Sequence, residues 1–252
     1  MNVKGMRTKL SPKLTEIAHQ TSRIPGLKFL LKPIYYRYKK HIDRNRNKIF
    51  KANALNILSD FDKILTENHI SYSVFAGTLL GAAREKGFIK HDIDIDTCMW
   101  NEDYSPQTEE ILRKAGFKLI RRFEIDNGKR GREETYQKDG IDIDIFYIYT
   151  DSSFDSYQCD FGYMKGTASH EESMRKYGCV RTRRIEFPVK KKFIRLPFET
   201  ITVNTITNYH EWLSYRYGKN YMIPDPSFED KGDNPNIQDW KEVKATYWRS
   251  ND

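Results

Sequence analysis

The stretch GTLLGAAREKGFIKHDIDIDTCMW, residues 77–100, begins with a Gly-Thr pair and contains aspartates that alternate with isoleucines. Residues two apart in a strand point to the same side of a sheet, so Asp92, Asp94 and Asp96 are expected to share one face. The intervening isoleucines would then face the core. Carboxylates held together on one face repel one another, so the pattern predicts an open edge where a cation compensates their charge.

A second strand pattern, GIDIDIFYIY at residues 140–149, puts Asp142 and Asp144 on one face and isoleucines and tyrosines on the other. Clustered carboxylate oxygens suit Mg²⁺, a hard ion that keeps several waters and bridges to substrate phosphates. Two metals bridged by shared carboxylates can hold a phosphoryl group during in-line displacement. The two strands therefore predict a magnesium site for phosphate chemistry, with Mn²⁺ as the other candidate cofactor.

Gly77 and Thr78 lie between an expected strand, SYSVFAG at 71–77, and an expected short helix, TLLGAAREKG at 78–87. Backbone N–H groups and the helix dipole at such a junction attract phosphate, and glycine permits a close approach. A Gly-Thr pair alone is more often a structural turn. Followed by two Asp-x-Asp strands, it indicates phosphate binding.

The sequence DIDIDT, residues 92–97, has two other interpretations. A calcium loop would have aspartates at its first, third and fifth positions, but Thr97 stands where glycine is required and Asp103 where glutamate is usual. A solvated edge strand would leave the charges facing water. The second Asp-x-Asp strand makes that simpler interpretation less favoured.

The composition favours anionic partners without choosing among them. The 252 residues suit one domain with appendages or two small domains, and the net charge is +8. Cys98, Cys159 and Cys179 form no CxxC pair, which favours a reducing cytoplasm over a disulfide scaffold. Zinc binding by Cys159, His170 and Cys179 would need a spacing that matches no familiar pattern. No apolar stretch reaches membrane-spanning length, and the N-terminus lacks a signal-peptide core.

Residues 1–48 are expected to form a basic N-terminal arm and residues 49–252 the catalytic domain. The arm mixes Leu, Ile, Phe and Tyr with Lys and Arg, which suits peripheral contact with an anionic membrane at its inner, cytoplasmic face. A helical arm packed on the domain, with its basic face in solvent, is the favoured alternative. Pro33 is expected to break the run.

Hydrophobic periodicity and turn signals predict the remaining elements. Helices are expected at 49–70, 105–116 and 208–218, and strands at 117–125, 132–138 and 141–149. The region from 151 to 206 is expected to mix loops with short strands.

This order of motifs resembles the nucleotidyltransferase superfamily of the DNA polymerase β type. More narrowly, residues 77–96 are similar to the signature of the LicD family, which includes fukutin and fukutin-related protein. That family usually shows Gly-Thr-Leu-Leu-Gly, an arginine, Gly-Phe-Ile and Trp-Asp-Asp-Asp-Ile-Asp, so His91 and Ile93 depart from its pattern. DIF at 144–146 and YGKNYMIP at 217–224 resemble two later segments, which extends the similarity over about residues 50–226.

The resemblance implies an α+β fold with a DNA polymerase β-type nucleotidyltransferase core, in which helices flank a mixed sheet. It also implies a Mg²⁺-dependent transferase. Such an enzyme moves a phospho-substituent, phosphocholine-like or an alditol phosphate, from a CDP-type nucleoside diphosphate conjugate. The acceptor would be a hydroxyl of a cell-surface glycan, a glycolipid or a lipid-linked saccharide.

The resemblance also implies roles for particular residues. Asp94, Asp96 and Asp144 would hold Mg²⁺ on the diphosphate, or Asp144 would accept the hydroxyl proton. Asp144 is preferred over Asp142 because it begins the Asp-Ile-Phe segment. Arg84 would neutralise developing charge, with an ion pair to Glu85 as its structural alternative. The expected donor-binding residues are Gly77, Thr78, Lys86 and Asp92.

Two rival functions use the same features. A nucleotidyltransferase that adds NMP from an NTP to a small molecule would need the same aspartates and would release pyrophosphate. A nucleic-acid-binding module would suit the basic charge and the aromatic residues. Against it, no recognition motif is present, and acidic strands repel phosphate unless a metal is bound, so no nucleic-acid partner is expected.

Overall fold

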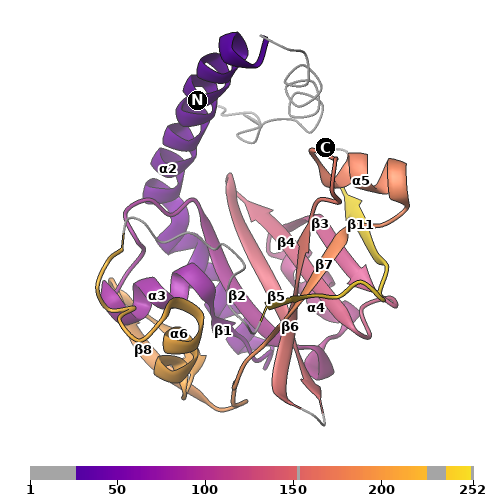
Figure 1. Cartoon of the computed structure of the whole chain (residues 1–252). Coiled ribbons are helices and arrows are strands. Elements are labelled where there is room, and N and C mark those ends of the chain that lie inside the picture. The colour runs from indigo at the N-terminus through magenta and orange to yellow at the C-terminus, as the bar shows by residue number, and fades with distance from the viewer. Residues whose placement is uncertain (1–26, 152–153, 226–236, 251–252) are drawn as a thin grey trace.

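A mixed nine-stranded sheet forms the framework of the protein (Figure 1). The computed structural model describes residues 27–151, 154–225 and 237–250. The strands of this sheet are β1 (Ser73–Val74), β2 (Asp94–Trp100), β3 (Lys118–Ile125), β4 (Gly131–Lys138), β5 (Ile141–Asp151), β6 (Phe154–Gly162), β7 (Arg181–Glu186), β10 (Ile237–Asp239) and β11 (Ala245–Arg249). A separate hairpin contains β8 (Phe193–Phe198) and β9 (Ile201–Ile206).

The strands follow the order β10-β7-β6-β5-β4-β3-β11, and β2 joins β5 in parallel while it also pairs with β1. The other pairings in the sheet are antiparallel. The helices are α2 (Leu27–Glu67), α3 (Ala76–Arg84), α4 (Pro106–Lys114), α5 (His170–Tyr177) and α6 (Tyr209–Tyr217), with a 3-10 turn η1 at Asn101–Asp103. The expected α+β class with a mixed sheet is confirmed, while the DNA polymerase β-type core stays a prediction.

Helix α2 includes residues 49–67 of the amphipathic segment expected at 49–70, ends at Glu67, and begins far earlier, at Leu27. The expected break at Pro33 is wrong, because α2 runs through this residue. The helix also crosses the expected boundary between residues 48 and 49, and its N-terminal part projects beyond the sheet (Figure 1). Residues 1–26 of the arm lie outside the described residues.

The site strands differ from expectation mainly at their ends. Strand β1 ends at Val74, and Gly77 is the second residue of α3 rather than the last residue of a strand. Strand β2 starts at Asp94, so Asp92 precedes the strand instead of sharing its face. Helix α4 is capped as expected, because the Ser105 hydroxyl accepts a hydrogen bond from the Gln107 backbone N–H.

Helix α5 was not expected, since the region from 151 to 206 was predicted to hold only loops and strands. Its sequence does carry helix signals. The Ser169 hydroxyl accepts a hydrogen bond from the Glu172 N–H, and Gly178 ends the helix in the left-handed conformation at φ 68°.

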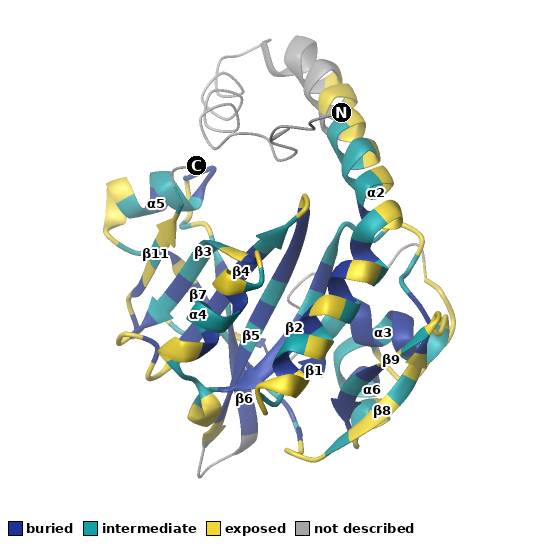
Figure 2. Ribbon diagram, turned by 180° about the vertical axis from the view of Figure 1, so that it is seen from behind, coloured by how far each residue is buried: buried dark blue, intermediate teal, exposed yellow. Residues whose placement is uncertain are grey.

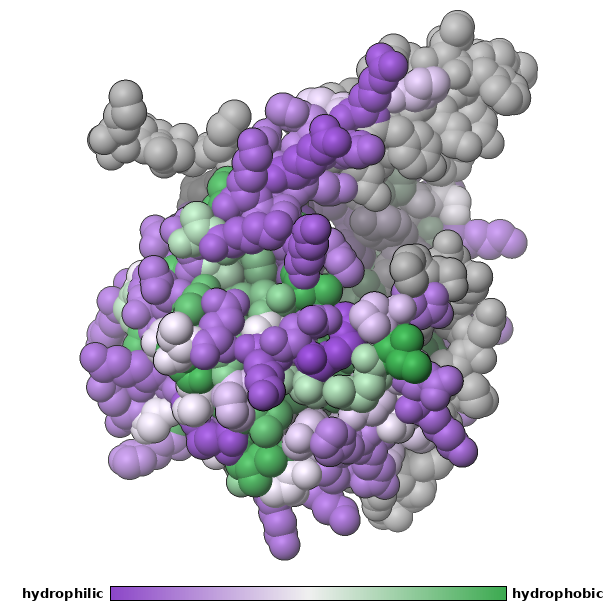
Figure 3. All heavy atoms as spheres, turned by 90° about the vertical axis from the view of Figure 1, so that its left-hand side faces the viewer, coloured by the Kyte–Doolittle hydropathy of each residue, from purple (hydrophilic) through white to green (hydrophobic). Residues whose placement is uncertain are grey.

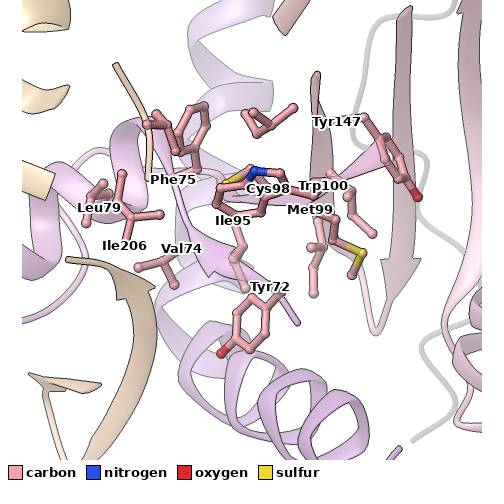
Figure 4. Close-up of a cluster of buried hydrophobic side chains, with 14 of the residues drawn as sticks. Tyr72, Val74, Phe75, Leu79, Ile95, Cys98, Met99, Trp100, Tyr147 and Ile206 are labelled. Atoms are coloured by element: carbon pink, nitrogen blue, oxygen red, sulfur yellow. The ribbon is translucent and has the colours of Figure 1, made fainter. Parts of the chain in front are cut away.

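The core lies between α2, α3 and the sheet, and dark blue residues concentrate along β2 and β5 (Figure 2). Ile95, Ile143 and Ile145 are fully buried, as the alternation predicted. The close-up in Figure 4 shows apolar side chains from the β1–α3 segment and β2 packed together, among them Phe75, Leu79 and Trp100. This packing fixes β2 and β5 and leaves Asp96 and Asp144 on the face opposite to their isoleucines. In the described residues, no helix is both long and apolar enough to cross a membrane.

We expect Leu58→Ala in α2 to lower the free energy of unfolding by about 2–5 kcal/mol, because its fully buried side chain would leave a cavity. Lys63→Ala in the same helix serves as control, since that side chain is 72% exposed and should change stability by less than about 0.5 kcal/mol. Urea unfolding followed by circular dichroism measures both. Equal losses in the two variants would contradict the packing of α2.

Candidate active site

The backbone register brings the aspartates of two distant segments together. In the parallel pair, Asp94 lies opposite Asp142 and Asp96 opposite Asp144. Opposed residues in a ladder place their side chains on the same face. The parallel register therefore forms the carboxylate cluster that each strand alone could only suggest.

The start of helix α3 holds Asp96 through two backbone contacts. The Gly77 N–H donates to Asp96 Oδ2 at 2.9 Å, and the Thr78 hydroxyl accepts from the Asp96 N–H at 2.9 Å. A Cβ on residue 77 would lie 3.1 Å from Asp96 Oδ2, so the absence of a side chain permits this approach. Both groups predicted to bind phosphate thus contact Asp96 directly, and phosphate binding by them stays a prediction.

Burial raises the pKa of Asp96 well above its ordinary value, and the neighbouring charges of Asp94 and Asp144 raise this pKa further. The Gly77 N–H opposes the shift only in part. Charging Asp96 next to the other two carboxylates is therefore costly unless a cation is close.

Arg121 of β3 supplies a positive charge at this cluster, and sequence reasoning missed it. Its guanidinium donates to Asp144 Oδ1 at 3.3 Å, to Glu133 Oε1 at 3.4 Å and to the Thr135 hydroxyl at 3.0 Å. Thr135 in turn donates to Asp144 Oδ1 at 2.5 Å. Burial alone would lower the pKa of Arg121, but Asp144 and Glu133 raise it above the ordinary value, so the residue stays charged. The sequence FKLIRRFEI did carry a signal for this role: adjacent residues of a strand point to opposite faces, so one of its two arginines had to lie on the face of the acids.

Asp142 has a different environment from Asp144. Its side chain is 3% exposed, accepts a hydrogen bond from Gln137 at 2.7 Å and lies 3.5 Å from the Arg46 guanidinium. The charge of Asp144 helps to raise the pKa of Asp96. Asp142, in contrast, lies opposite Asp94 in the register. The structure thus separates a buried aspartate, bound by side chains, from one that lies beside Asp96.

Two residues of α2 hold the segment that precedes β2. Arg46 donates to the Ile93 carbonyl at 3.3 Å, and Asn47 donates to the Asp92 carbonyl at 2.8 Å and to the Lys90 carbonyl at 3.1 Å. These contacts were also missed, because the arm was expected to pack on the domain but none of its residues was assigned to the site. Part of the expected arm therefore belongs to the wall of the site.

The remaining predicted residues lie beside the cluster rather than within it. The Asp92 carboxylate accepts from the Ile89 N–H at 2.8 Å; burial raises its pKa, and the charge of Arg84 opposes this. Arg84 makes the alternative ion pair, at 2.9 Å to Glu85. Lys86 is exposed, and its backbone carbonyl accepts a hydrogen bond from the Glu199 N–H.

The carboxylates of the cluster differ from a complete metal site in their arrangement. Within residues 27–151, 154–225 and 237–250, no three His, Cys, Asp or Glu side chains are arranged to hold a metal ion together. This also leaves the zinc alternative without support. Carboxylate oxygens and the mutual repulsion at Asp96 nevertheless fit a hard divalent cation. By type and placement Asp94, Asp96 and Asp144 suit Mg²⁺, while Asp144 is turned toward Arg121.

Sequence comparisons with known proteins match the segment that carries this site to a described domain. A family model for the LicD/FKTN/FKRP nucleotidyltransferase domain matches residues 69–209, which include α3, β2 and β5. The chain is 25% identical over 208 residues to the mouse (Mus musculus) ribitol-5-phosphate transferase FKTN, covering 79% of this chain and 41% of that protein. It is 22% identical over 243 residues to the human protein of the same name, covering 91% of this chain and 49% of that protein.

A shorter match has higher identity. The lipopolysaccharide cholinephosphotransferase LicD of Haemophilus influenzae is 50% identical over 51 residues, which is 20% of this chain and 19% of that protein. The chain thus spans less than half the length of these curated relatives.

We expect Asp96→Asn to raise the melting temperature of the protein in EDTA at pH 7. The pKa of Asp96 in the folded protein is raised above its ordinary value of 3.8. The protein therefore has its full share of stability from this group below pH 3.8 and loses it as the pH rises through the folded-state pKa. Asparagine still accepts the Gly77 hydrogen bond but carries no charge. The shift should be about 2–4 °C per kcal/mol relieved, and it should vanish near pH 3.

The matched control is Asp126→Asn, in a turn where the aspartate is 55% exposed. Scanning calorimetry from pH 3 to pH 8 compares both variants with the parent protein. A destabilised Asp96→Asn at pH 7 would show that the cluster is not repulsive without metal.

Proposed function

The chain belongs to the LicD/FKTN/FKRP nucleotidyltransferase-domain family, and we propose that it transfers a phospho-substituent from a CDP-type conjugate to a hydroxyl. The transferred group would be phosphocholine-like or an alditol phosphate, and the acceptor a cell-surface glycan, a glycolipid or a lipid-linked saccharide. The activities that two relatives are named for, ribitol-5-phosphate transfer and lipopolysaccharide cholinephosphotransfer, support this class.

One structural observation carries the proposal. Asp96 and Asp144 lie opposite each other on parallel strands, and Asp96 is held by the first turn of α3. Carboxylates beside a helix N-terminus can attract a metal-bound phosphate, because the cation neutralises the acids while the N–H groups face the anion. A structural ion-pair network would not need this placement at a helix start.

In the proposed reaction, the acceptor oxygen attacks the phosphorus that bears the transferred group. A new P–O bond forms, the bond to CMP breaks, and CMP leaves with the negative charge. Asp144 accepts the proton of the attacking hydroxyl, while the Thr135 hydroxyl and the opposing strand keep its carboxylate oriented. The Gly77 N–H holds the Asp96 carboxylate.

A divalent cation, Mg²⁺ or Mn²⁺, would supply charge neutralisation on the diphosphate when bound, with Asp94, Asp96 and Asp144 as its ligands. Arg84, Lys86 and Asp92 are proposed to contact the donor. Asp92 and Arg84 lie within electrostatic reach of each other, so a donor phosphate near Arg84 would sit at the edge of the acidic cluster.

The decisive experiment incubates the protein with a panel of CDP- and UDP-conjugates in Mg²⁺, Mn²⁺ or EDTA and measures nucleotide release. Metal-dependent CMP release, abolished in Asp94→Asn and Asp96→Asn, supports the proposal. Pyrophosphate release from an NTP would favour the nucleotidyltransferase rival instead. Salt-sensitive binding of an oligonucleotide in EDTA, without turnover of any conjugate, would favour a nucleic-acid-binding module.

We expect Asp144→Asn to lower turnover by about 10²–10⁴-fold, the range associated with loss of a positioned general base. Asp142→Asn should cost less than about tenfold, since Asp142 is buried between Gln137 and Arg46 rather than beside Asp96. Initial rates at saturating metal and donor measure both. An inactive Asp142→Asn with an active Asp144→Asn would move the catalytic position two residues toward the N-terminus.

We also propose that the basic part of α2 contacts an anionic membrane. Its described residues expose Arg37, Tyr38, Lys40, His41, Arg44 and Lys48. In Figure 3 hydrophilic side chains gather on the upper part of the molecule, where α2 projects. Mixed basic and aromatic residues suit an anionic lipid surface. The cytoplasmic location stays a prediction.

Replacing Arg37, Lys40 and Arg44 together by Gln should weaken partitioning onto phosphatidylserine vesicles by about 100-fold, at about 1 kcal/mol per charge. Lys63, Lys219 and Lys241, which are exposed outside this segment, give a control triple variant. Vesicle co-sedimentation at low salt measures the difference. Equal binding by both triple variants would leave α2 with a packing role only.

A further inference from the structure

We propose that Arg121 is a built-in counter-cation of the carboxylate site and that a divalent metal competes with it for Asp144. Once displaced, its guanidinium turns to the diphosphate of the donor. This inference rests on the proposed function, because it assumes a metal at Asp94, Asp96 and Asp144. It assigns to β3 a positioning residue that couples metal binding to donor binding.

The backbone register places Arg121 in one line with the site. Asp96 lies opposite Asp144, Asp144 opposite Thr135, and Thr135 opposite Arg121 across β2, β5, β4 and β3. Opposed residues share a face, so the guanidinium reaches the acids from the same side of the sheet. The side chain is 23% exposed, so the guanidinium is partly shielded from solvent yet accessible to a ligand.

The next residue shows that this orientation is specific. Arg122 faces the opposite side of the sheet and binds Glu134 at 2.8 Å and Glu109 at 2.6 Å. Those short contacts are typical of a permanent charge-assisted pair. The contacts of Arg121 to Asp144 and Glu133, at 3.3 and 3.4 Å, are longer. Arg121 also donates to the neutral Thr135 hydroxyl at 3.0 Å, so it is the acidic contacts of Arg121, and not its place in the sheet, that are longer than those of Arg122 and open to a competing cation.

Charge explains why the two cations exclude each other. A divalent ion binds carboxylate oxygen at about 2.1 Å, and Asp144 Oδ1 already accepts from both Thr135 and Arg121. A guanidinium at the same oxygen would repel the metal, so metal binding removes Arg121 from Asp144.

Glu133 keeps the displaced guanidinium within the site. Its carboxylate is the second acidic partner of Arg121 and lies on the same strand as Thr135. A guanidinium released from Asp144 but retained at Glu133 presents its remaining N–H groups to the anionic donor. Arginine suits this exchange, because its planar group can engage two partners at once.

The test measures Mn²⁺ and nucleotide binding to the metal-free full chain by calorimetry and electron paramagnetic resonance. Arg121→Gln should bind Mn²⁺ about tenfold more tightly, the size expected for removing one charge-assisted competitor. At saturating Mn²⁺ it should bind CDP about tenfold more weakly. Arg249→Gln is the matched control: Arg249 lies opposite Arg121 on β11 but pairs with Glu171, and both affinities should stay within about twofold.

Two further variants separate this role from a structural one. In the Asp144→Asn background, Arg121→Gln should change Mn²⁺ affinity by less than about twofold, because the shared ligand is gone. Arg121→Lys keeps a cation if the Gln variant fails to fold. It should tighten Mn²⁺ binding by about threefold, since one ammonium cannot match the guanidinium contacts.

The outcomes distinguish this inference from the proposed function. If the parent chain binds Mn²⁺ and Arg121→Gln, or Arg121→Lys in its place, binds it equally or more weakly, the counter-cation role is overturned alone. If the parent chain binds no Mn²⁺, or binds it equally well after Asp96→Asn, the metal site and this inference are overturned together. Tighter Mn²⁺ binding with weaker CDP binding supports both.

Discussion

The structure depends on apolar packing that holds the carboxylates of a parallel strand pair together against their mutual repulsion. Ile95, Ile143 and Ile145 are fully buried, and their packing sets the register in which Asp96 faces Asp144. A slip by one residue would turn the isoleucines away from the apolar core and the acids into it. The apolar core therefore stabilises an arrangement that electrostatics alone would disfavour. Such arrangements of charged groups are typical of functional sites.

The surrounding elements offset this repulsion with donors from three directions. The α3 start gives the Gly77 N–H to Asp96, β3 gives Arg121 to Asp144, and α2 gives Arg46 to Asp142. Each donor comes from a different part of the chain, so the cluster ties a helix start, an adjacent hairpin and the long helix to one point. These contacts position the site at the junction of the sheet and the helices (Figure 1).

Local patterns in the sequence predicted the strands that carry the acids. They missed Arg121 and Arg46, because these residues reach the site only through the pairing and packing of distant segments. Alternation predicted β2, β5 and the faces of their isoleucines, because strand periodicity is a property of neighbouring residues. The proximity of Arg121 depends on the register of the β3–β4–β5 ladder, and that of Arg46 on how α2 packs. Neither follows from a short motif. The α5 signals at Ser169 and Gly178 were present but stood in a region without clear periodicity.

Helix α2 has two roles that a division between arm and domain would separate. Its exposed basic residues reach Arg44 and Lys48, while Arg46 and Asn47 between them contact the segment before β2. A helix repeats every 3.6 residues, so one short stretch can present cations to solvent and hydrogen-bond donors to the site. The stretch of α2 that exposes the basic residues is therefore also the stretch that holds the wall of the site.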